Sequence, residues 1–498
     1  MTPVHNALRR LFNRSTPAVA AVLVFLTLAQ WAAAAGFKPD EVLVKLRSPA
    51  ALATIVSNFG VVQTTQFGSR PIYRLRLPAN SNVDTVVNQL TGNADVLLAE
   101  PNYTHDTPEA RKNLPWAFGS AGAYVAQWAP AAMHLPEAHL FAKGAGVRVA
   151  VLDTGVDLSH PVLVGKLLPG YDFVDGDADP SEVSCTPTPC SVAGLGYGHG
   201  THVAGLIALA APLAKIIPYR VLDPNGEGNA WVLVEALQRA IDPDGNAATN
   251  DGAHVINMSL GTATRTRILA SIAKLFTCEP PDDTDPLLNF SDAGYDNDKA
   301  RCANGTAPVI VAAAGNDGNS SVKEYPAAES VYGLISVGAS NDSRRLATFS
   351  NSGSWVQVAA PGEGITSAIP TAASPSGFGT WSGTSMASPL VAGAVALLRS
   401  AQPEMAARDV VRRVARMTTP LIGTNIEQVN AAAIVEVCTM DVDGDGVVLP
   451  TTDGLILMRA MMGMTDVAVS SAASPTALRK NWTDIRRYLV DACGMNLP

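Results

Sequence analysis

Short apolar runs alternate with stretches of helical length through the middle of the chain. Strand-like runs lie at residues 148–152, 215–221, 254–258, 308–313 and 334–337. Residues 230–241 have the length and pattern of a helix between two of these runs. Strands that alternate with helices are typical of a parallel sheet with helices on both faces. We therefore expect a large α/β domain at the centre of the chain.

A smaller unit with a different pattern precedes this domain. Residues 42–46, 73–77 and 96–103 are predicted strands, and apolar and basic positions alternate in the second, as in a half-buried sheet. Residues 50–59 and 83–90 are predicted helices, the latter capped by Ser81 or Asn82. This order predicts a small α+β unit of ferredoxin-like type.

Residues 1–35 are expected to lie outside the fold. Three arginines precede an apolar run at 18–29, and small residues at 33–36 offer a cleavage site. The run is too short to span a bilayer as a permanent helix, so it predicts a secretory signal. No stable membrane span is expected after signal removal. We expect a secreted, extracellular protein, with a periplasmic or cell-surface location left open.

Length, charge and cysteine content narrow the picture. The 498 residues suggest two or three domains, and 35 basic against 44 acidic residues give a net charge of −9, which argues against a nucleic-acid partner. In an oxidising compartment the six cysteines predict three disulfides. Fifteen pairings are possible, and proximity in sequence favours three local ones: Cys185–Cys190, Cys278–Cys302 and Cys438–Cys493. The acidic segment 279–299 is expected to be a surface insertion, without an assigned function.

Three short blocks, each containing glycine, carry candidate chemistry. Ser385 stands in Gly-Thr-Ser-Met-Ala-Ser-Pro before an apolar helix, Asp153 ends an apolar strand before Thr-Gly, and His199 lies in Gly-His-Gly-Thr-His. A lone serine there is usually a helix cap, and a lone Asp-Thr-Gly also fits pepsin-like proteases, which need two copies. A serine nucleophile, however, requires a base and an acid that orients the base. Together the blocks resemble the subtilisin-like serine proteases (subtilases), a family known for the chain order Asp, His, Ser.

The resemblance implies a subtilisin-like fold and roles for further residues. It implies that Asn316, in Ala-Ala-Gly-Asn, donates to the oxyanion, whereas turn geometry alone explains most such asparagines. It also implies that Ser259, Leu260 and Gly261 form an edge for substrate backbone, although a buried strand end is the simpler interpretation. Glu324, before Tyr-Pro, would then lie at the floor of the primary pocket and favour Lys or Arg; a solvated loop charge is the alternative.

The resemblance also divides the chain. Residues 36–110 resemble a subtilase propeptide, an inhibitor and chaperone whose tail occupies the active site until it is cut between Tyr103 and Trp116; an independent adhesive domain is the alternative. Residues 111–437 are the expected peptidase domain. His202, one turn beyond His199, is expected to be structural, because no ligand-like partner accompanies it.

Two acidic clusters suggest calcium. Hard carboxylate oxygens without thiolates suit Ca²⁺. The first cluster comprises Asp172, Asp175, Asp177 and Asp179, for which a solvated acidic turn is equally acceptable. The second lies in residues 438–498 and comprises Asp441, Asp443, Asp445 and Asp453, with glycine at the sixth loop position. Predicted helices at 454–462 and 482–489 complete a unit that resembles a dockerin or EF-hand with one extra loop residue.

The sequence therefore predicts a secreted serine endopeptidase made as an autoprocessed zymogen. Protein substrates and its own propeptide are the expected partners, structural Ca²⁺ the only expected cofactor, and a monomer the expected state. Two alternatives belong to other classes: a catalytically idle binding protein on the same scaffold, disfavoured because no catalytic residue is missing, and a surface-assembled component in which the C-terminal unit matters most.

Overall fold

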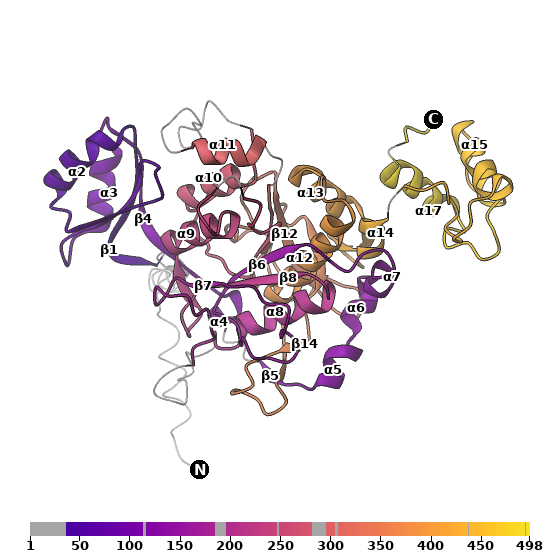
Figure 1. Ribbon diagram of the computed structural model, residues 1–498, viewed down its shortest axis with the longest axis horizontal. Coiled ribbons are helices and arrows are strands. Elements are labelled where there is room, and N and C mark those ends of the chain that lie inside the picture. The colour runs from indigo at the N-terminus through magenta and orange to yellow at the C-terminus, as the bar shows by residue number, and fades with distance from the viewer. Residues whose placement is uncertain are drawn as a thin grey trace, which may run out of the picture.

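The computed structural model describes residues 36–112, 116–184, 196–246, 249–280, 295–303, 307–436, 438–493 and 495–498. Figure 1 shows a small N-terminal unit on the left, a large α/β domain in the centre and a small C-terminal unit on the right. The expected signal (1–35), the pair Cys185–Cys190 and residues 281–294 of the acidic insertion lie outside the described residues. Cys278–Cys302 and Cys438–Cys493 are bonded, which confirms two of the three expected disulfides.

The N-terminal unit is an antiparallel sheet with two helices. Its strands are ordered β2 (Gln63–Gln66), β3 (Ile72–Arg76), β1 (Phe37–Leu46) and β4 (Val96–Asp106). The helices are α2 (Leu52–Phe59) and α3 (Val83–Thr91); Asn82 caps α3 by accepting from the Thr85 amide at 2.8 Å. The order matches the expected ferredoxin-like type, but β2 was not predicted. Its Gln-Thr-Thr-Gln sequence is all polar, so no hydrophobic pattern marks it.

The central domain is organised around a nine-stranded sheet. The order is β16 (Thr418–Pro420), β17 (Glu427–Val429), β13 (Val358–Pro361), β12 (Leu334–Ser340), β11 (Val309–Ala313), β10 (Val255–Met258), β6 (Arg148–Asp153), β8 (Lys215–Arg220) and β7 (Tyr171–Asp172). From β17 to β7 neighbouring strands are parallel, and the edge pair β16–β17 is antiparallel. The carboxyl ends of β6, β10 and β11 therefore meet at one edge, where ligand sites of such sheets lie.

Alternating side chains of these strands build two cores. Val149 and Val151 of β6 pack on one face with α8 (His199–Ala210) and α12 (Thr384–Ala401). Ala150 and Leu152 face the other side, against α9 (Ala230–Ile241) and α10 (Arg267–Phe276). Successive residues of a strand point to opposite faces, and both faces here are covered, so the strands read as continuous apolar runs. The expected parallel sheet with helices on both faces is confirmed.

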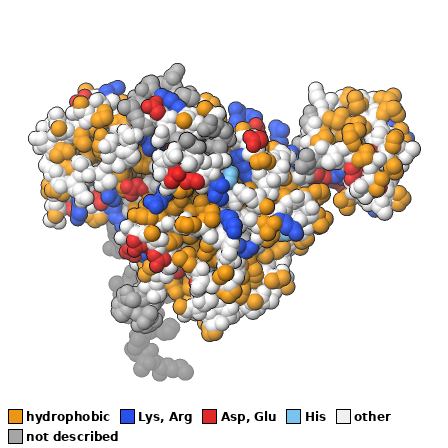
Figure 2. Space-filling view, viewed as in Figure 1, with side chains coloured by type: hydrophobic (Ala, Val, Ile, Leu, Met, Phe, Trp, Pro, Cys, Tyr) orange, Lys and Arg blue, Asp and Glu red, His pale blue; other side chains and the backbone are white. Residues whose placement is uncertain are grey.

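The C-terminal unit has a core and a disulfide of its own. It contains α15 (Leu455–Met461), α16 (Val467–Ser470) and α17 (Trp482–Arg487), packed around Ile456, Val469 and Ile485 and closed by Cys438–Cys493. Figure 2 shows hydrophobic side chains gathered on its surface; the exposed ones include Met458, Met461, Met462, Val467 and Leu478. Within the described part of the chain, no helix combines the length and apolar character needed to cross a membrane.

Candidate active site

Asp153 and His199 meet where β6 ends and α8 begins. Asp153 is the last residue of β6 and is buried; its Oδ1 lies 2.7 Å from His199 Nδ1. The same oxygen accepts from the Thr154 amide at 2.8 Å, which fixes the carboxylate. Gly200 permits the close approach, because a Cβ on it would lie 2.1 Å from the carbonyl oxygen of Gly155. Glycine therefore follows His199 in the sequence because the first turn of α8 packs closely against the end of β6.

Ser385 and Asn316 lie on the other side of this histidine. Ser385 is in the first turn of α12, where unpaired amides and the helix dipole favour negative charge. Asn316 follows β11, and its Oδ1 accepts from both the amide and the hydroxyl of Thr384, each at 2.9 Å. These two bonds leave the Asn316 NH₂ group pointing toward the serine. A carbonyl oxygen beside Ser385 would therefore meet a fixed side-chain donor.

The residue that occupies this space is Glu109, in α4 (Pro108–Arg111) at the end of the N-terminal unit. Its Oε1 accepts from Asn316 Nδ2 at 2.7 Å, and its Oε2 accepts from Ser385 Oγ at 2.6 Å and lies 3.2 Å from His199 Nε2. All four side chains are buried. Gly383 admits the carboxylate, because a Cβ there would lie 1.7 Å from Glu109 Oε1. One carboxylate therefore contacts serine, histidine and asparagine at once.

Electrostatics of this cluster favour an imidazolium between two carboxylates. Burial opposes charge on His199, but Asp153 and Glu109 outweigh it and raise the pKa of His199 to about 10. Burial likewise opposes ionisation of Glu109, yet the hydrogen bonds and charge of His199, with those of Ser385 and Asn316, lower the Glu109 pKa. The carboxylate of Glu109 thus occupies hydrogen-bonding groups of Ser385, His199 and Asn316.

The chain that carries Glu109 reaches the cluster as an added strand. β4 pairs antiparallel with β9 (Glu227–Asn229), and Asp106 and Gly261 exchange backbone hydrogen bonds of 3.0 and 2.9 Å. The Thr107 amide donates to the carbonyl of Gly226 at 3.1 Å. Backbone pairing of this kind holds an extended peptide without regard to its side chains. Residues 104–106 therefore lie between β9 and Gly261 of the central domain, and the chain leaves both at α4.

Glu324 is fully buried next to the same edge. A Cβ on Gly261 would lie 2.3 Å from Glu324 Oε1, and one on Gly315 would lie 3.1 Å from the Glu324 Cβ. Ser259 and Leu260 are buried as well, and Ser259 Oγ donates to the carbonyl of Ser385 at 2.9 Å. The structure therefore brings Ser259, Leu260, Gly261 and Glu324 together beside Ser385, and Glu324 is not a solvated loop charge.

Sequence reasoning missed Glu182, which bridges the two segments that carry Asp153 and His199. Its carboxylate accepts from Thr154 Oγ1 at 3.1 Å, from the Thr201 amide at 3.0 Å and from the Gly198 amide at 3.0 Å. Desolvation, with the nearby charge of Asp153, raises the pKa of Glu182 to about 7 despite these bonds. No motif marks Glu182, whereas Glu109 stood within the tail expected to reach the active site.

His202 is a buried framework residue. Its Nε2 lies 3.2 Å from the carbonyl oxygen of Gly379, and its ring packs edge-on against Trp381. Burial, with the charge of His199, lowers the pKa of His202 to about 3. A neutral imidazole held in this way agrees with the structural role expected for it.

The first acidic cluster is engaged by an arginine. Arg220, at the end of β8, donates from Nη1 to Asp172 Oδ2 and to Asp175 Oδ2, each at 2.5 Å. Asp177 and Asp179 instead accept from backbone amides within their own turns. Within the described residues, the carboxylates of these four do not converge as a group that could hold a metal ion. Calcium at this cluster stays a prediction.

The second acidic cluster does converge. Carboxylate oxygens of Asp441, Asp443 and Asp453 lie within 4.8 Å of one another, and Gly446 has the positive φ of 86° that a sharp loop turn needs. Asp445 is not part of this group, and its Oδ1 accepts from the Val447 amide at 2.9 Å. An all-oxygen donor set of this kind fits Ca²⁺. A role for Asp445 as a ligand stays a prediction.

Comparison with known proteins gives the family. Residues 144–440 match the subtilase family and residues 28–102 match the fervidolysin N-terminal prodomain. A thermophilic serine proteinase of Bacillus sp. (strain AK1) is 37% identical over 330 residues, covering 64% of this chain and 67% of the relative. Thermitase of Thermoactinomyces vulgaris is 35% identical over 284 residues, 55% of this chain and 82% of the relative.

A solved structure shares the fold. Fervidolysin from Fervidobacterium pennivorans, a keratinolytic enzyme related to subtilisin, superposes with a TM-score of 0.59 at 22% identity. The match covers 80% of this chain, which spans 61% of that one, and it establishes the fold alone.

The chain belongs to the subtilase family of subtilisin-like serine peptidases, because the matched region covers more than half of its length. It is a serine endopeptidase made as a zymogen, with a fervidolysin-type prodomain ahead of the peptidase domain. Protein substrates and its own prodomain are its partners.

Proposed function

We propose that Asp153, His199 and Ser385 form the catalytic triad and that Asn316 stabilises the oxyanion. The observation that carries this proposal is the convergence of Ser385, His199 and Asn316 on one carboxylate, that of Glu109, at 2.6–3.2 Å. A tetrahedral intermediate presents similar oxygens to the same three groups. Asp153 then orients His199 through Nδ1 and stabilises its protonated form.

The reaction follows from these positions once Glu109 has left. His199 Nε2 accepts the proton of Ser385 as Oγ bonds to the substrate carbonyl carbon, and the oxyanion accepts from Asn316 and from the Ser385 amide. His199 then protonates the leaving amine as the C–N bond breaks. Water, activated by the same histidine, hydrolyses the acyl-enzyme and restores the serine.

Covalent labelling tests this assignment. A serine-directed sulfonyl fluoride is expected to modify Ser385 of the processed enzyme, and the tryptic peptide containing that residue is expected to gain the corresponding mass. His199→Ala removes the base and is expected to abolish labelling, whereas Ser388→Ala, one helical turn away, leaves it intact. Labelling that persists in His199→Ala would contradict the assignment.

Substrate binding is proposed to reuse the backbone pairing of the tail. Ser259, Leu260 and Gly261 would receive an extended substrate on one side, as Gly261 receives Asp106. Glu324 would then lie at the base of the primary pocket and favour Lys or Arg before the cleaved bond by direct charge pairing with the substrate side chain. The test compares peptides that differ only at this residue, in the wild type and in Glu324→Gln. Faster cleavage after Leu or Phe than after Lys or Arg by the wild type would refute this preference.

For the C-terminal unit we propose structural calcium, held by Asp441, Asp443 and Asp453. Calcium that binds only the folded unit would stabilise it by about 2.7 kcal/mol at a hundred times its dissociation constant. Protection against autolysis is the proposed purpose. Recognition of a partner in the manner of a dockerin is the alternative, and the single loop argues against it. Isothermal titration of Ca²⁺ into Ser385→Ala tests the site: Asp443→Asn should lose binding that Asp445→Asn retains.

We also propose how the chain is divided and processed. We propose a signal at residues 1–35, a prodomain at 36–110, a peptidase domain at 111–437 and the calcium unit at 438–498. The protein would be secreted as a monomer and would lose its prodomain by self-cleavage. Light scattering of the secreted product, with its N-terminal sequence, tests both statements.

A further inference from the structure

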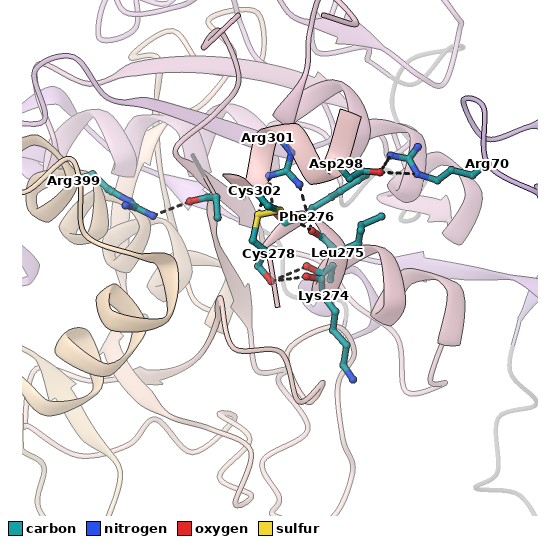
Figure 3. The surroundings of a disulfide bond; sticks show 12 residues. Arg70, Lys274, Leu275, Phe276, Cys278, Asp298, Arg301, Cys302 and Arg399 are labelled. Carbon is teal, nitrogen blue, oxygen red and sulfur yellow. Dashed lines mark hydrogen bonds and ion pairs between the residues drawn. A yellow bond between two sulfur atoms is a disulfide. The ribbon is translucent and has the colours of Figure 1, made fainter. Parts of the chain in front are cut away.

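A disulfide joins the chain just after α10 to a second helix that precedes β11. Cys278, just after α10, is bonded to Cys302 in α11 (Asp296–Ala303). Arg301 of the same helix donates from Nη1 to the carbonyl of Phe276 at 2.8 Å and from Nη2 to that of Leu275 at 3.3 Å. Figure 3 shows α11 tied in this way to the last turn of α10. Helix α11 is therefore anchored to the end of α10 in the peptidase domain.

The prodomain places an arginine against α11 and the end of α10. Arg70, in the turn between β2 and β3, donates from Nη2 and Nε to Asp298 Oδ2 at 2.6 and 3.2 Å (Figure 3). Its guanidinium carbon lies 5.6 Å from the ring centre of Phe276 and 5.5 Å from that of Tyr295. The side chains of Arg70 and Asp298 are only 5% and 2% exposed. We call Phe276, Tyr295 and Asp298 the arginine socket.

The chemistry of the socket selects a guanidinium. Aromatic faces and a buried carboxylate together satisfy the charge and the flat surface of an arginine, and a lysine forms no such fork. A second prodomain cation is near, because Lys45 Nζ lies 5.3 Å from the ring centre of Tyr295. Removing one member of a buried ion pair leaves the other charge buried without that partner. The pair of Arg70 and Asp298 should therefore stabilise the docked prodomain.

We propose that the arginine socket docks Arg70 of this chain's own prodomain, and that it retains the prodomain after the tail has been cut. The proposal rests on the proposed self-cleavage, and it adds a second point of control outside the active site. Cleavage alone would not release activity; Arg70 must also leave Phe276, Tyr295 and Asp298.

The test follows the full-length chain after it folds. Mass spectrometry gives the time of chain cleavage, and a peptide substrate gives the time at which activity appears; the interval between them reports prodomain release. In Arg70→Gln and in Asp298→Asn this interval is expected to shorten by about thirtyfold or more, the effect of truncating one partner of a buried charge pair. The double variant should resemble the single ones, because either change breaks the same pair. Arg76→Gln, an exposed arginine on β3, is the matched control and should not shorten it.

An unchanged interval in both single variants would overturn the proposal. A second measurement decides the matter if a variant folds poorly or if the wild type is never cut. In the uncut Ser385→Ala chain, hydrogen exchange of amides at residues 67–72 is expected to quicken in Asp298→Asn and to remain slow in Arg76→Gln. Equal exchange in all three chains would refute the socket, whereas an uncut wild type with quickened exchange would refute only self-cleavage.

Discussion

Glu109 is the residue whose removal should change the zymogen most. Its carboxylate holds Ser385, Asn316 and His199 together, and no other described side chain contacts all three. Glu109→Gln keeps the shape and removes the charge, and Glu109→Ala removes both. We expect both variants, made in the full-length chain, to release active enzyme sooner than the wild type does.

The magnitude follows from burial. Glu109 and His199 are fully buried and form a charge-assisted pair, and truncating one partner of such a pair across an interface costs about 2–5 kcal/mol. At about 1.4 kcal/mol per factor of ten, prodomain release should accelerate about 30-fold to 4,000-fold. Glu109→Gln is expected at the lower end, because its amide still accepts from Asn316.

The effect should depend on pH in a defined direction. Asp153 and Glu109 raise the pKa of His199 to about 10 in the closed zymogen, and only the part due to Asp153 remains once Glu109 has left. A group that binds its proton more tightly in the closed state stabilises that state fully below its pKa in the released enzyme, and this stabilisation is lost as the pH rises toward 10. Glu109 has a lowered pKa, so its contribution is present above the usual pKa of a carboxyl group and fades only in stronger acid. Release should therefore quicken as the pH is raised from 7 toward 10.

The assay records peptidase activity against time at several pH values, with chain cleavage followed in parallel by mass. Asp95→Asn, an exposed carboxylate of the prodomain, is the control for charge. If Glu109→Ala releases activity no faster than Asp95→Asn, the carboxylate does not hold the zymogen closed and the reasoning fails.

Three further predictions concern other residues. Asn316→Ala should lower kcat by about 10²–10³ with little change in KM, measured on processed enzyme whose active sites have been titrated, because the donor acts on the oxyanion and not on the ground state. Glu324→Gln should reduce the preference for Lys over Leu at the cleaved residue by about tenfold or more, read from the ratio of kcat/KM values. Glu182→Ala should lower the thermal midpoint of Ser385→Ala chains by several degrees, because two amides at the start of α8 and the Thr154 hydroxyl after β6 lose their acceptor, and scanning calorimetry checks the shift.

The residues that could be predicted from the sequence lie where the local backbone requires small neighbouring residues. Asp153, His199 and Ser385 sit where a strand or helix end must pack closely, so glycines and small residues surround each of them. Asn316 follows the apolar β11 for the same reason. The alternation of strands and helices likewise predicted the parallel sheet, since its central strands, such as β6 and β11, are buried and largely apolar.

The residues that escaped prediction depend on contacts distant in the chain. Arg220 pairs with Asp172 and Asp175 because parallel pairing of β7 with β8 sets Asp172 opposite Arg220, a register that composition does not reveal. Arg70 and Asp298 are 228 residues apart, and neither belongs to a recognisable motif. Glu109 belongs to a tail whose path is set by pairing with β9 and Gly261, so the position of its side chain follows only from the fold.

The most direct test of the whole account is the intact mass of the secreted product, wild type beside Ser385→Ala. The account predicts that the wild type loses the region from Gly36 to about residue 110, while Ser385→Ala keeps it. That result would identify Ser385 as a working nucleophile and would fix the mature N-terminus. Full-length chains in both samples, or equal processing in both, would contradict self-cleavage by Ser385.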